Sequence, residues 1–182
     1  MKIFRAFAVI SAISVGFAQP ARAQDAPKAE FGLGYQYMHD VDSSQDFPFG
    51  WVLSPGADVT SWLGLVFEVG GSYKTVSVGT VDFNQNVYTF LAGPKIMASS
   101  KAPVAPFVQV LFGGAHGSLS VGAPSVNLTF SGNHFAIQPG VGIDFNPSPT
   151  FGLRVEADGR GINTDSGTNK EWRLLAGVVL RR

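Results

Sequence analysis

Apolar residues alternate with polar ones along most of this chain, and the face formed by every second residue carries no charge. A period of two is typical of β-strands, because successive side chains point to opposite sides of a sheet. The pattern predicts eight strands, around residues 31–37, 51–59, 63–69, 88–96, 108–114, 135–145, 151–157 and 172–180. The opposite face carries charges among many glycines, namely Glu30, Asp58, Glu68, Lys95, Asp144, Arg154, Glu156, Asp158, Arg173 and Arg181.

The connections between these segments alternate in length. We expect long loops at 40–48, 74–85, 117–133 and 160–169, and short turns at 60–61, 98–103 and 146–149. Segments of roughly 9–12 residues suit tilted strands that cross a bilayer. Lipid satisfies no free backbone groups, so such a sheet has to close on itself. The sequence therefore predicts an eight-stranded antiparallel up-and-down transmembrane β-barrel, all-β, with both termini in the periplasm.

Composition supports a lipid-facing exterior. Only 14% of residues are charged, against about 25% in soluble domains, and aromatic residues gather near the expected segment ends as two girdles would. The alternative is a soluble periplasmic lipocalin-like barrel, which would need a polar exterior. Pro55, Pro94 and Pro139 fall inside strands. Since proline lacks the backbone donor, we expect bulges or locally broken pairing there.

The N-terminus has the features of a secretory signal peptide. Lys2 and Arg5 precede an uncharged run from Ala6 to Ala18, and Ala21-Arg22-Ala23 fits a cleavage site. We expect a signal peptide at 1–23 and one mature domain at 24–182. Removing three of 13 basic residues and none of 13 acidic ones leaves a net charge of −3. Such a charge offers nucleic acid no general attraction.

Three local sequences carry a resemblance to a known family. They are Gly50-Trp51 to Trp62-Leu63-Gly64-Leu65, Ala92-Gly93-Pro94-Lys95, and Val104-Ala105-Pro106-Phe107 to Phe112-Gly113-Gly114-Ala115-His116. With them, the mature chain resembles small bacterial outer-membrane β-barrel proteins of OmpA/OmpX type. The resemblance implies export to the bacterial outer membrane by way of its assembly machinery. The chain ends in Arg181-Arg182, whereas barrels of this family generally end in an aromatic residue.

The inward charges are the main candidate site. Glu68, Lys95, Asp144, Arg154 and Glu156 should lie inside the barrel, where eight strands leave room only for side chains. We expect them to pair as a salt-bridged plug, because an unpaired buried charge costs several kcal/mol. The alternative is a gated narrow channel, or a site for a small hydrophobic ligand. In the gated channel, Glu68 would switch between Lys95 and Arg154.

Catalysis has a single weak motif in this sequence. His116-Gly117-Ser118 is similar to the His-x-Ser pair of outer-membrane lipid A deacylases, but Leu119 replaces the asparagine that follows in that family. We therefore expect no enzyme, and no metal site or cofactor. The alternative is a lipid-modifying enzyme.

Four cations are expected near the outer rim, where they would contact lipopolysaccharide phosphates. These are Lys74, Arg160, Lys170 and Arg173. The remaining expected partner is the lipid bilayer, and we expect a monomer. The predicted role is structural, in envelope integrity or surface interaction.

Overall fold

The structure is a computed structural model that describes residues 29–78, 81–99, 102–123, 126–164 and 167–182. The expected signal peptide lies outside these residues. Within them, no helix has both the length and the hydropathy to span a membrane. The strands are β1 (Ala29–Asp40), β2 (Gln45–Phe47), β3 (Phe49–Asp58), β4 (Leu63–Val78), β5 (Val81–Met97), β6 (Val104–Ala123), β7 (Val126–Phe145), β8 (Phe151–Thr164) and β9 (Gly167–Arg181).

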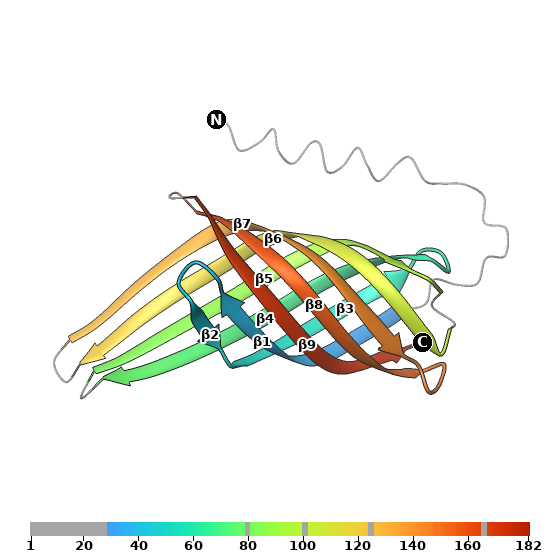
Figure 1. Cartoon of the computed structure of the whole chain (residues 1–182), viewed down its shortest axis with the longest axis horizontal. Coiled ribbons are helices and arrows are strands. Elements are labelled where there is room, and N and C mark those ends of the chain that lie inside the picture. Colours follow the sequence, from blue (N-terminus) through green and yellow to red (C-terminus); the bar gives the residue numbers. More distant parts are fainter. Residues whose placement is uncertain (1–28, 79–80, 100–101, 124–125, 165–166) are drawn as a thin grey trace.

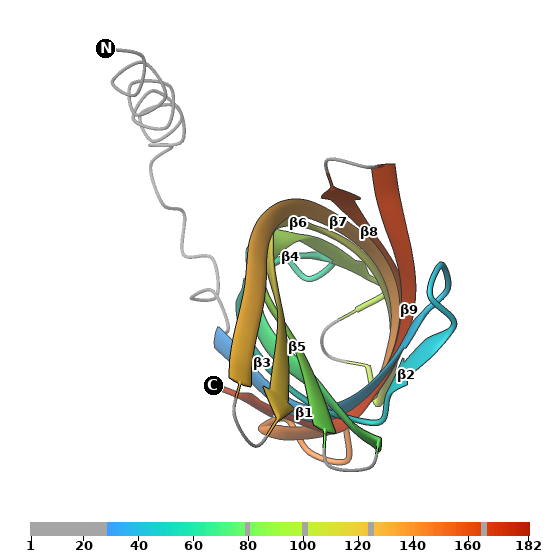
Figure 2. The same ribbon diagram turned by 90° about the vertical axis from the view of Figure 1, so that its left-hand side faces the viewer.

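Eight of these strands form a closed antiparallel barrel (Figures 1 and 2). Neighbours in sequence pair from β3 to β9, and β1 closes the ring by pairing with both β3 and β9. The short β2 pairs with the last residues of β1, from Met38 to Asp40, and forms a hairpin at the barrel rim. The predicted eight-stranded barrel is confirmed, with β2 as an addition inside the expected 40–48 loop.

Each strand proline interrupts one ladder without shifting its register. Pairing stops between Leu53 and Gly56 on β3 and resumes in the same register, and the gaps at Pro94 and Pro139 behave alike. The missing donor of each proline therefore costs two residue pairs on one side only. This outcome confirms the expected locally broken pairing, while the unchanged registers show that no residue is inserted.

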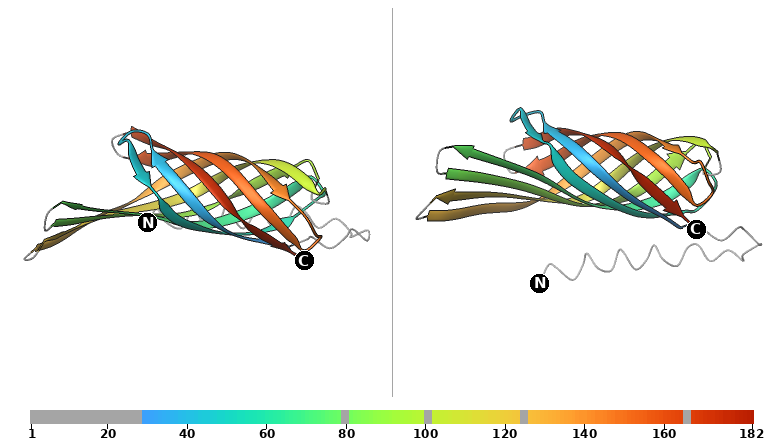
Figure 3. Two further views of the ribbon diagram at one scale, coloured as in Figure 1. Left: turned by 60° about the horizontal axis from the view of Figure 1, so that its bottom comes forward. Right: turned by 90° about the horizontal axis from the view of Figure 1, so that it is seen from below.

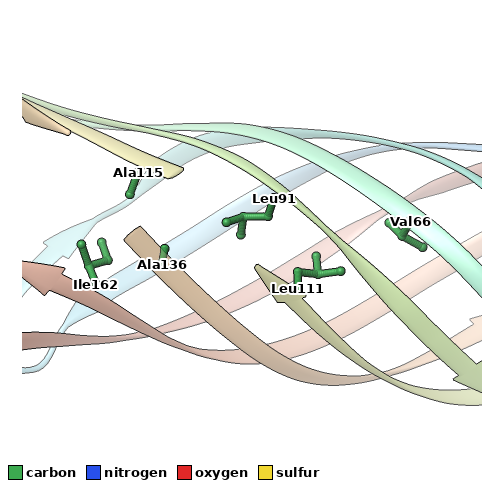
Figure 4. Packing of buried hydrophobic residues seen from close by; sticks show 6 residues of the cluster. All are labelled: Val66, Leu91, Leu111, Ala115, Ala136 and Ile162. Atoms are coloured by element: carbon green, nitrogen blue, oxygen red, sulfur yellow. The ribbon is translucent and has the colours of Figure 1, made fainter. Parts of the chain in front are cut away.

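The barrel wall is apolar outside and largely polar inside. Phe90, Val141 and Val155 point outward and remain 52%, 56% and 56% exposed. Inside, a small apolar cluster comes from five adjacent strands, β4 to β8 (Figure 4). Its members are Val66, Leu91, Leu111, Ala115, Ala136 and Ile162. The rest of the interior is dominated by buried polar and charged side chains.

Four strands continue well beyond the barrel wall. The β4–β5 and β6–β7 hairpins project past the other strands at the end opposite the C-terminus (Figure 3). Pairing of β4 with β3 ends at Tyr73, and pairing of β7 with β8 ends at Phe135. Beyond these points β4 to β7 stay paired with one another, and we call residues 74–78, 81–87, 116–123 and 126–134 the projecting sheet.

The projecting sheet corrects two sequence-based expectations. The segments 74–85 and 117–133 were expected to be loops, because their Gly, Ser, Asn and Asp content is typical of loops. The described parts of both are paired strands instead. The segment 160–169 is likewise mostly strand, within β8 and β9. Cross-strand pairing has overridden a weak local preference.

Candidate functional site

A first cluster of charges lies inside the barrel, near the start of β1 and the end of β9. Arg154 donates two hydrogen bonds to Asp144, at 2.7 and 2.9 Å, and also reaches Glu30 at 3.3 Å. Lys95 pairs with Glu30, and Arg181 pairs with both Glu30 and Asp144. We call these five residues the terminal cluster. Three cations surround two carboxylates, all 9% exposed or less.

A second cluster fills the middle of the barrel and is centred on Arg173. Its guanidinium binds Glu68 through both terminal nitrogens, at 2.8 and 3.0 Å, and also binds Glu156 at 2.7 Å and Asp158 at 2.7 Å. We call these four residues the central cluster. The planar fork of arginine suits such simultaneous contacts, which a lysine ammonium would not reproduce.

Neutral side chains complete the central cluster. Gln138 donates to Glu68 at 3.2 Å, and Gln109 donates to Glu156 at 2.9 Å. Gly140 matters for a steric reason, because a Cβ there would collide with the Asp158 carboxylate. The glycine therefore leaves room for the acid that lies opposite it on β8.

The ion pairs inside the barrel differ from the predicted ones. In the alternative of a gated channel, Glu68 would exchange between Lys95 and Arg154, but the cation that it pairs with is Arg173. Lys95 and Arg154 are instead held by Glu30 and Asp144 in the terminal cluster. The structure thus places all five expected interior charges inside the barrel but divides them between two separate clusters.

Two of the four expected rim cations lie inside the barrel. Arg173 and Arg160 are only 1% and 3% exposed, so neither reaches lipopolysaccharide. Arg160 binds Glu171 at 3.2 Å and Gln138 at 2.8 Å. Alternation along each strand places both side chains inside the barrel. Arg160 shares its face of β8 with Arg154 and Glu156, and Arg173 shares its face of β9 with Arg181. The same reasoning recovers the other interior charges that were not assigned to the site, which are Glu30, Asp58, Asp158, Glu171 and Arg181.

The other two expected rim cations differ in exposure. Lys170 is exposed on β9, whereas Lys74 is half-buried at the start of the projecting sheet. The Lys74 ammonium donates to Gln45 at 3.2 Å and lies 6.0 Å from the centre of the Phe47 ring. Lys170 is therefore exposed at the rim, whereas Lys74 is oriented by its contacts with the β1–β2 hairpin.

The polarity of the sheet is reversed in its projecting part. On the face that continues the barrel interior, most side chains are apolar, namely Val76, Val81, Phe83, Val87, Leu119, Val121, Leu128 and Phe130. On the face that continues the lipid-facing surface they are polar, including Thr75, Asn84, Asn86, Ser118, Ser120, Thr129 and Ser131. The registers of β4 to β7 run through without a slip. The reversal is therefore a property of the sequence and not the result of a shift in register.

The His116 motif does not form a nucleophile and base pair. The His116 imidazole contacts Asn133 at 2.7 Å across the β6–β7 ladder, and Ser118 lies opposite Ser131. Within the described part of the chain, no group of three or more His, Asp or Glu residues is placed to hold a metal ion. Within the described residues, the hydrogen-bond partner of the His116 ring is therefore Asn133 and not Ser118.

The β1–β2 hairpin is fixed by a small polar network at the rim. Asp46 accepts hydrogen bonds from the Tyr37 hydroxyl and from His39, both at 2.6 Å. Both bonds stabilise the charged form of the Asp46 carboxyl and so hold its pKa below the usual value, and the bond from Tyr37 contributes most. Tyr37 and His39 also pack against Trp172, with ring centres 5.5 and 5.3 Å apart.

A comparison with protein families shows which family this chain belongs to. The sequence model of the outer membrane protein beta-barrel domain family matches residues 6–179. The chain belongs to this family. Its place is therefore the bacterial outer membrane, embedded in the lipid bilayer. A sequence search of curated proteins gives no significant match.

Solved structures of the same fold agree with this assignment. Ail of Yersinia pestis, solved in complex with the heparin analogue sucrose octasulfate, is 19% identical, with a TM-score of 0.62, and the match covers 85% of this chain and 99% of Ail. Neisserial surface protein A is 14% identical, with a TM-score of 0.62 and coverage of 85% and 96%. The N-terminal barrel of Pseudomonas aeruginosa OprF is 16% identical, with a TM-score of 0.57 and coverage of 86% and 97%. At these identities the likeness establishes the fold alone.

Proposed function

We propose that this outer-membrane barrel is a non-enzymatic surface protein whose projecting sheet meets partners outside the cell. The observation that carries the proposal is the division of the molecule into two parts. The barrel interior is occupied by paired charges, including the fully buried Arg173, Lys95 and Glu68. The four projecting strands, by contrast, extend beyond the wall where a membrane protein meets water. Short turns of such barrels face the periplasm, so the projecting sheet faces outward.

Shortening one projecting hairpin tests the proposal. Replacing residues 118–131 by Asn-Gly would join Gly117 to Gly132, which already face each other across the ladder, through a two-residue turn. The shortened and full-length proteins are expressed in a deletion strain, and both adhesion to an epithelial cell monolayer and detergent sensitivity are measured. We expect the shortened protein to restore detergent resistance but not adhesion. Equal adhesion by both proteins would contradict a surface role for the sheet.

The same proposal excludes conduction through the barrel. Eight strands leave an interior just wide enough for side chains, whereas porins use 16–18 strands. The purified barrel in a planar bilayer should give no discrete conductance steps. Reproducible steps that change in Glu68→Gln would instead favour the narrow channel.

The non-enzymatic part of the proposal has its own test. Lipid A extracted from cells that express the wild type, or the His116→Ala variant, should have the same mass as lipid A from cells without the protein. Loss of an acyl chain that depends on His116 would overturn this part.

Lysines at the rim support a contact with lipopolysaccharide. Lys74 and Lys170 are the two expected rim cations that the interior does not sequester, and cations at this level meet anionic head groups. We expect the double variant Lys74→Gln/Lys170→Gln to release bound lipopolysaccharide at lower salt than the wild type. Unchanged salt dependence would argue against the contact.

A further inference from the structure

The central cluster contains more acid than base. Its three carboxylates share the single guanidinium of Arg173. The terminal cluster has the opposite imbalance, with three cations for two carboxylates, and the Arg160–Glu171 pair is balanced. These three groups together therefore keep one acid in excess. An uncompensated negative charge at this depth of a bilayer is costly, so the excess needs a positive charge.

Arg173 has no further hydrogen-bond donor to offer. A guanidinium carries five N–H donors. Nε donates to Asp158 at 2.8 Å, and Nη1 donates to Gln36 at 3.0 Å and to Glu68 at 2.8 Å. Nη2 donates to Glu68 at 3.0 Å and to Glu156 at 2.7 Å. The five donors thus have five acceptor contacts, and none remains for another oxygen of the cluster.

Two oxygen atoms at the central cluster lack a hydrogen-bond donor. They are Oδ1 of Asp158 and Oε1 of Gln109, both buried and without a hydrogen-bond partner in the described part of the chain. The two residues flank Gly140 in one row of the sheet, Gln109 on β6 and Asp158 on β8. A Cβ at Gly140 would lie 1.9 Å from Oδ1 of Asp158, so this oxygen occupies the space over the glycine. That space lacks a hydrogen-bond donor.

The surrounding strands do not supply the missing positive charge. The neighbouring charged side chains are Glu68 on β4, Lys95 on β5, Arg154 and Arg160 on β8, and Arg173 on β9, while β1, β6 and β7 present the amides of Gln36, Gln109 and Gln138. Lys95 and Arg154 are held by the carboxylates of the terminal cluster, and Arg160 is held by Glu171. Among the described residues, Arg173 alone forms ion pairs with the acids of the central cluster.

We propose that the central cluster binds one proton at neutral pH, shared by Glu156 and Asp158 beside Gly140. Each of these two carboxylates lies 2.7 Å from the same guanidinium nitrogen, Nη2 of Arg173, so the two charges are close enough to titrate as a pair. The proton cancels the excess acid charge. It also converts a carboxylate into a carboxylic acid, whose O–H is the donor that this space lacks. The inference goes beyond the surface role proposed above and does not depend on it.

Infrared spectroscopy tests for this proton directly, because a protonated carboxylic acid has a C=O band that a carboxylate lacks. The full barrel is measured at neutral pH in vesicles of an ether-linked phosphatidylcholine, which has no ester carbonyl to mask the band. We expect a band in the wild type that shifts in D₂O and is lost in both Glu156→Gln and Asp158→Asn. Glu171→Gln is the matched control, since it removes a buried carboxylate that has its own cation, and it should keep the band.

Urea unfolding of the same proteins gives a second readout. An amide resembles the protonated acid, so Glu156→Gln and Asp158→Asn should each keep the wild-type unfolding midpoint. Glu171→Gln should lower the midpoint, because it leaves Arg160 without its carboxylate. Exchange of sodium chloride for choline chloride should change no midpoint.

Four results would each overturn the proposal. The first is the absence of the band from the wild type, which decides the question even where a variant does not fold. The second is a band that survives in both Glu156→Gln and Asp158→Asn, or that disappears in Glu171→Gln. The third is a lower midpoint in both variants of the pair. The fourth is a wild-type midpoint that falls in choline chloride, because a bound metal cation would then supply the positive charge.

Discussion

Arg173 is the side chain on which the interior depends most. Among the described residues it is the only cation that forms ion pairs with the three carboxylates of the central cluster, and it is 1% exposed. Removing one partner of a buried ion pair leaves uncompensated charge, which is strongly destabilising. A single residue therefore determines whether three acids on β4 and β8 are tolerated inside the barrel.

The variant Arg173→Met tests this dependence while keeping side-chain length. We expect it to lower the free energy of unfolding by about 3–5 kcal/mol. Urea unfolding in lipid vesicles measures the change. Lys170→Met is the matched control on the same strand, and we expect an effect within about 0.5 kcal/mol, because Lys170 is exposed. Equal unfolding midpoints for Arg173→Met and the wild type would contradict the ion pairs of the central cluster.

Asp46 gives the β1–β2 hairpin a defined pH dependence. Its pKa is lowered in the folded protein, so its stabilising contribution is complete above the unfolded value of about 3.9 and is lost as pH falls through the lower folded value. NMR signals of the Tyr37 ring should therefore stay constant down to about pH 4 and change only below it. Asp46→Asn should abolish that step. A Tyr37 transition centred well above pH 4 that Asp46→Asn removes would show that the carboxylate is not stabilised.

At the scale of elements, β7 carries both kinds of outward surface on one strand. Val141 is 56% exposed in the barrel wall, and Ser131 is exposed on the same face of the projecting sheet. Ten residues apart, both side chains point to the same side of β7. If the reversal of polarity marks the membrane boundary, only the first faces hydrocarbon.

Arginine substitutions at these two positions test the boundary. We expect Val141→Arg to destabilise the inserted barrel by about 2–4 kcal/mol, and Ser131→Arg by about 0–1 kcal/mol, following the depth dependence known for lipid-facing positions. Unfolding in vesicles of defined thickness gives both values. A large cost at Ser131 would place the projecting sheet in lipid and contradict the assignment.

The elements also show what the sequence predicts and where it fails. Alternation over eight segments predicts the wall strands, because one face must meet lipid along their whole length. From Val87 and Gly117 toward the hairpin tips, apolar and polar residues still alternate, but the apolar ones now lie on the inner face. A pattern without apolar residues on the lipid-facing side was interpreted as a loop. Arg160 and Arg173 were placed at the rim from their nearness to an expected loop. Once β8 and β9 are extended, parity puts both inside.

Other features depend on contacts that a single sequence does not contain. Parity places Glu68 inside the barrel, but it does not choose Arg173 over Lys95 as its partner. That choice follows from the stagger of the strands around the closed ring. A pocket at the barrel mouth is likewise lined by both Asp40 and Phe130, although 90 positions separate them in the chain.

On the scale of the whole molecule, closure of β1 against β9 makes the other features possible. It removes the sheet edges from lipid, encloses the charges that would otherwise face hydrocarbon, and brings the start of β1 and the end of β9 together at the side opposite the projecting sheet (Figure 3). Eleven residue pairs, from Glu30–Arg181 to Asp40–Glu171, join these two strands. The account of a closed membrane barrel stands or falls with this contact.

Heat-modifiability after membrane fractionation is the most direct measurement of that claim. Tagged protein is expressed in a Gram-negative host, and the fractions are run on a gel with and without boiling. We predict recovery in the outer membrane, with an unboiled band that migrates differently from the boiled one because the closed barrel resists detergent. Recovery as a soluble periplasmic protein without a band shift would contradict the account, since the apolar face would then enclose an interior instead of meeting lipid.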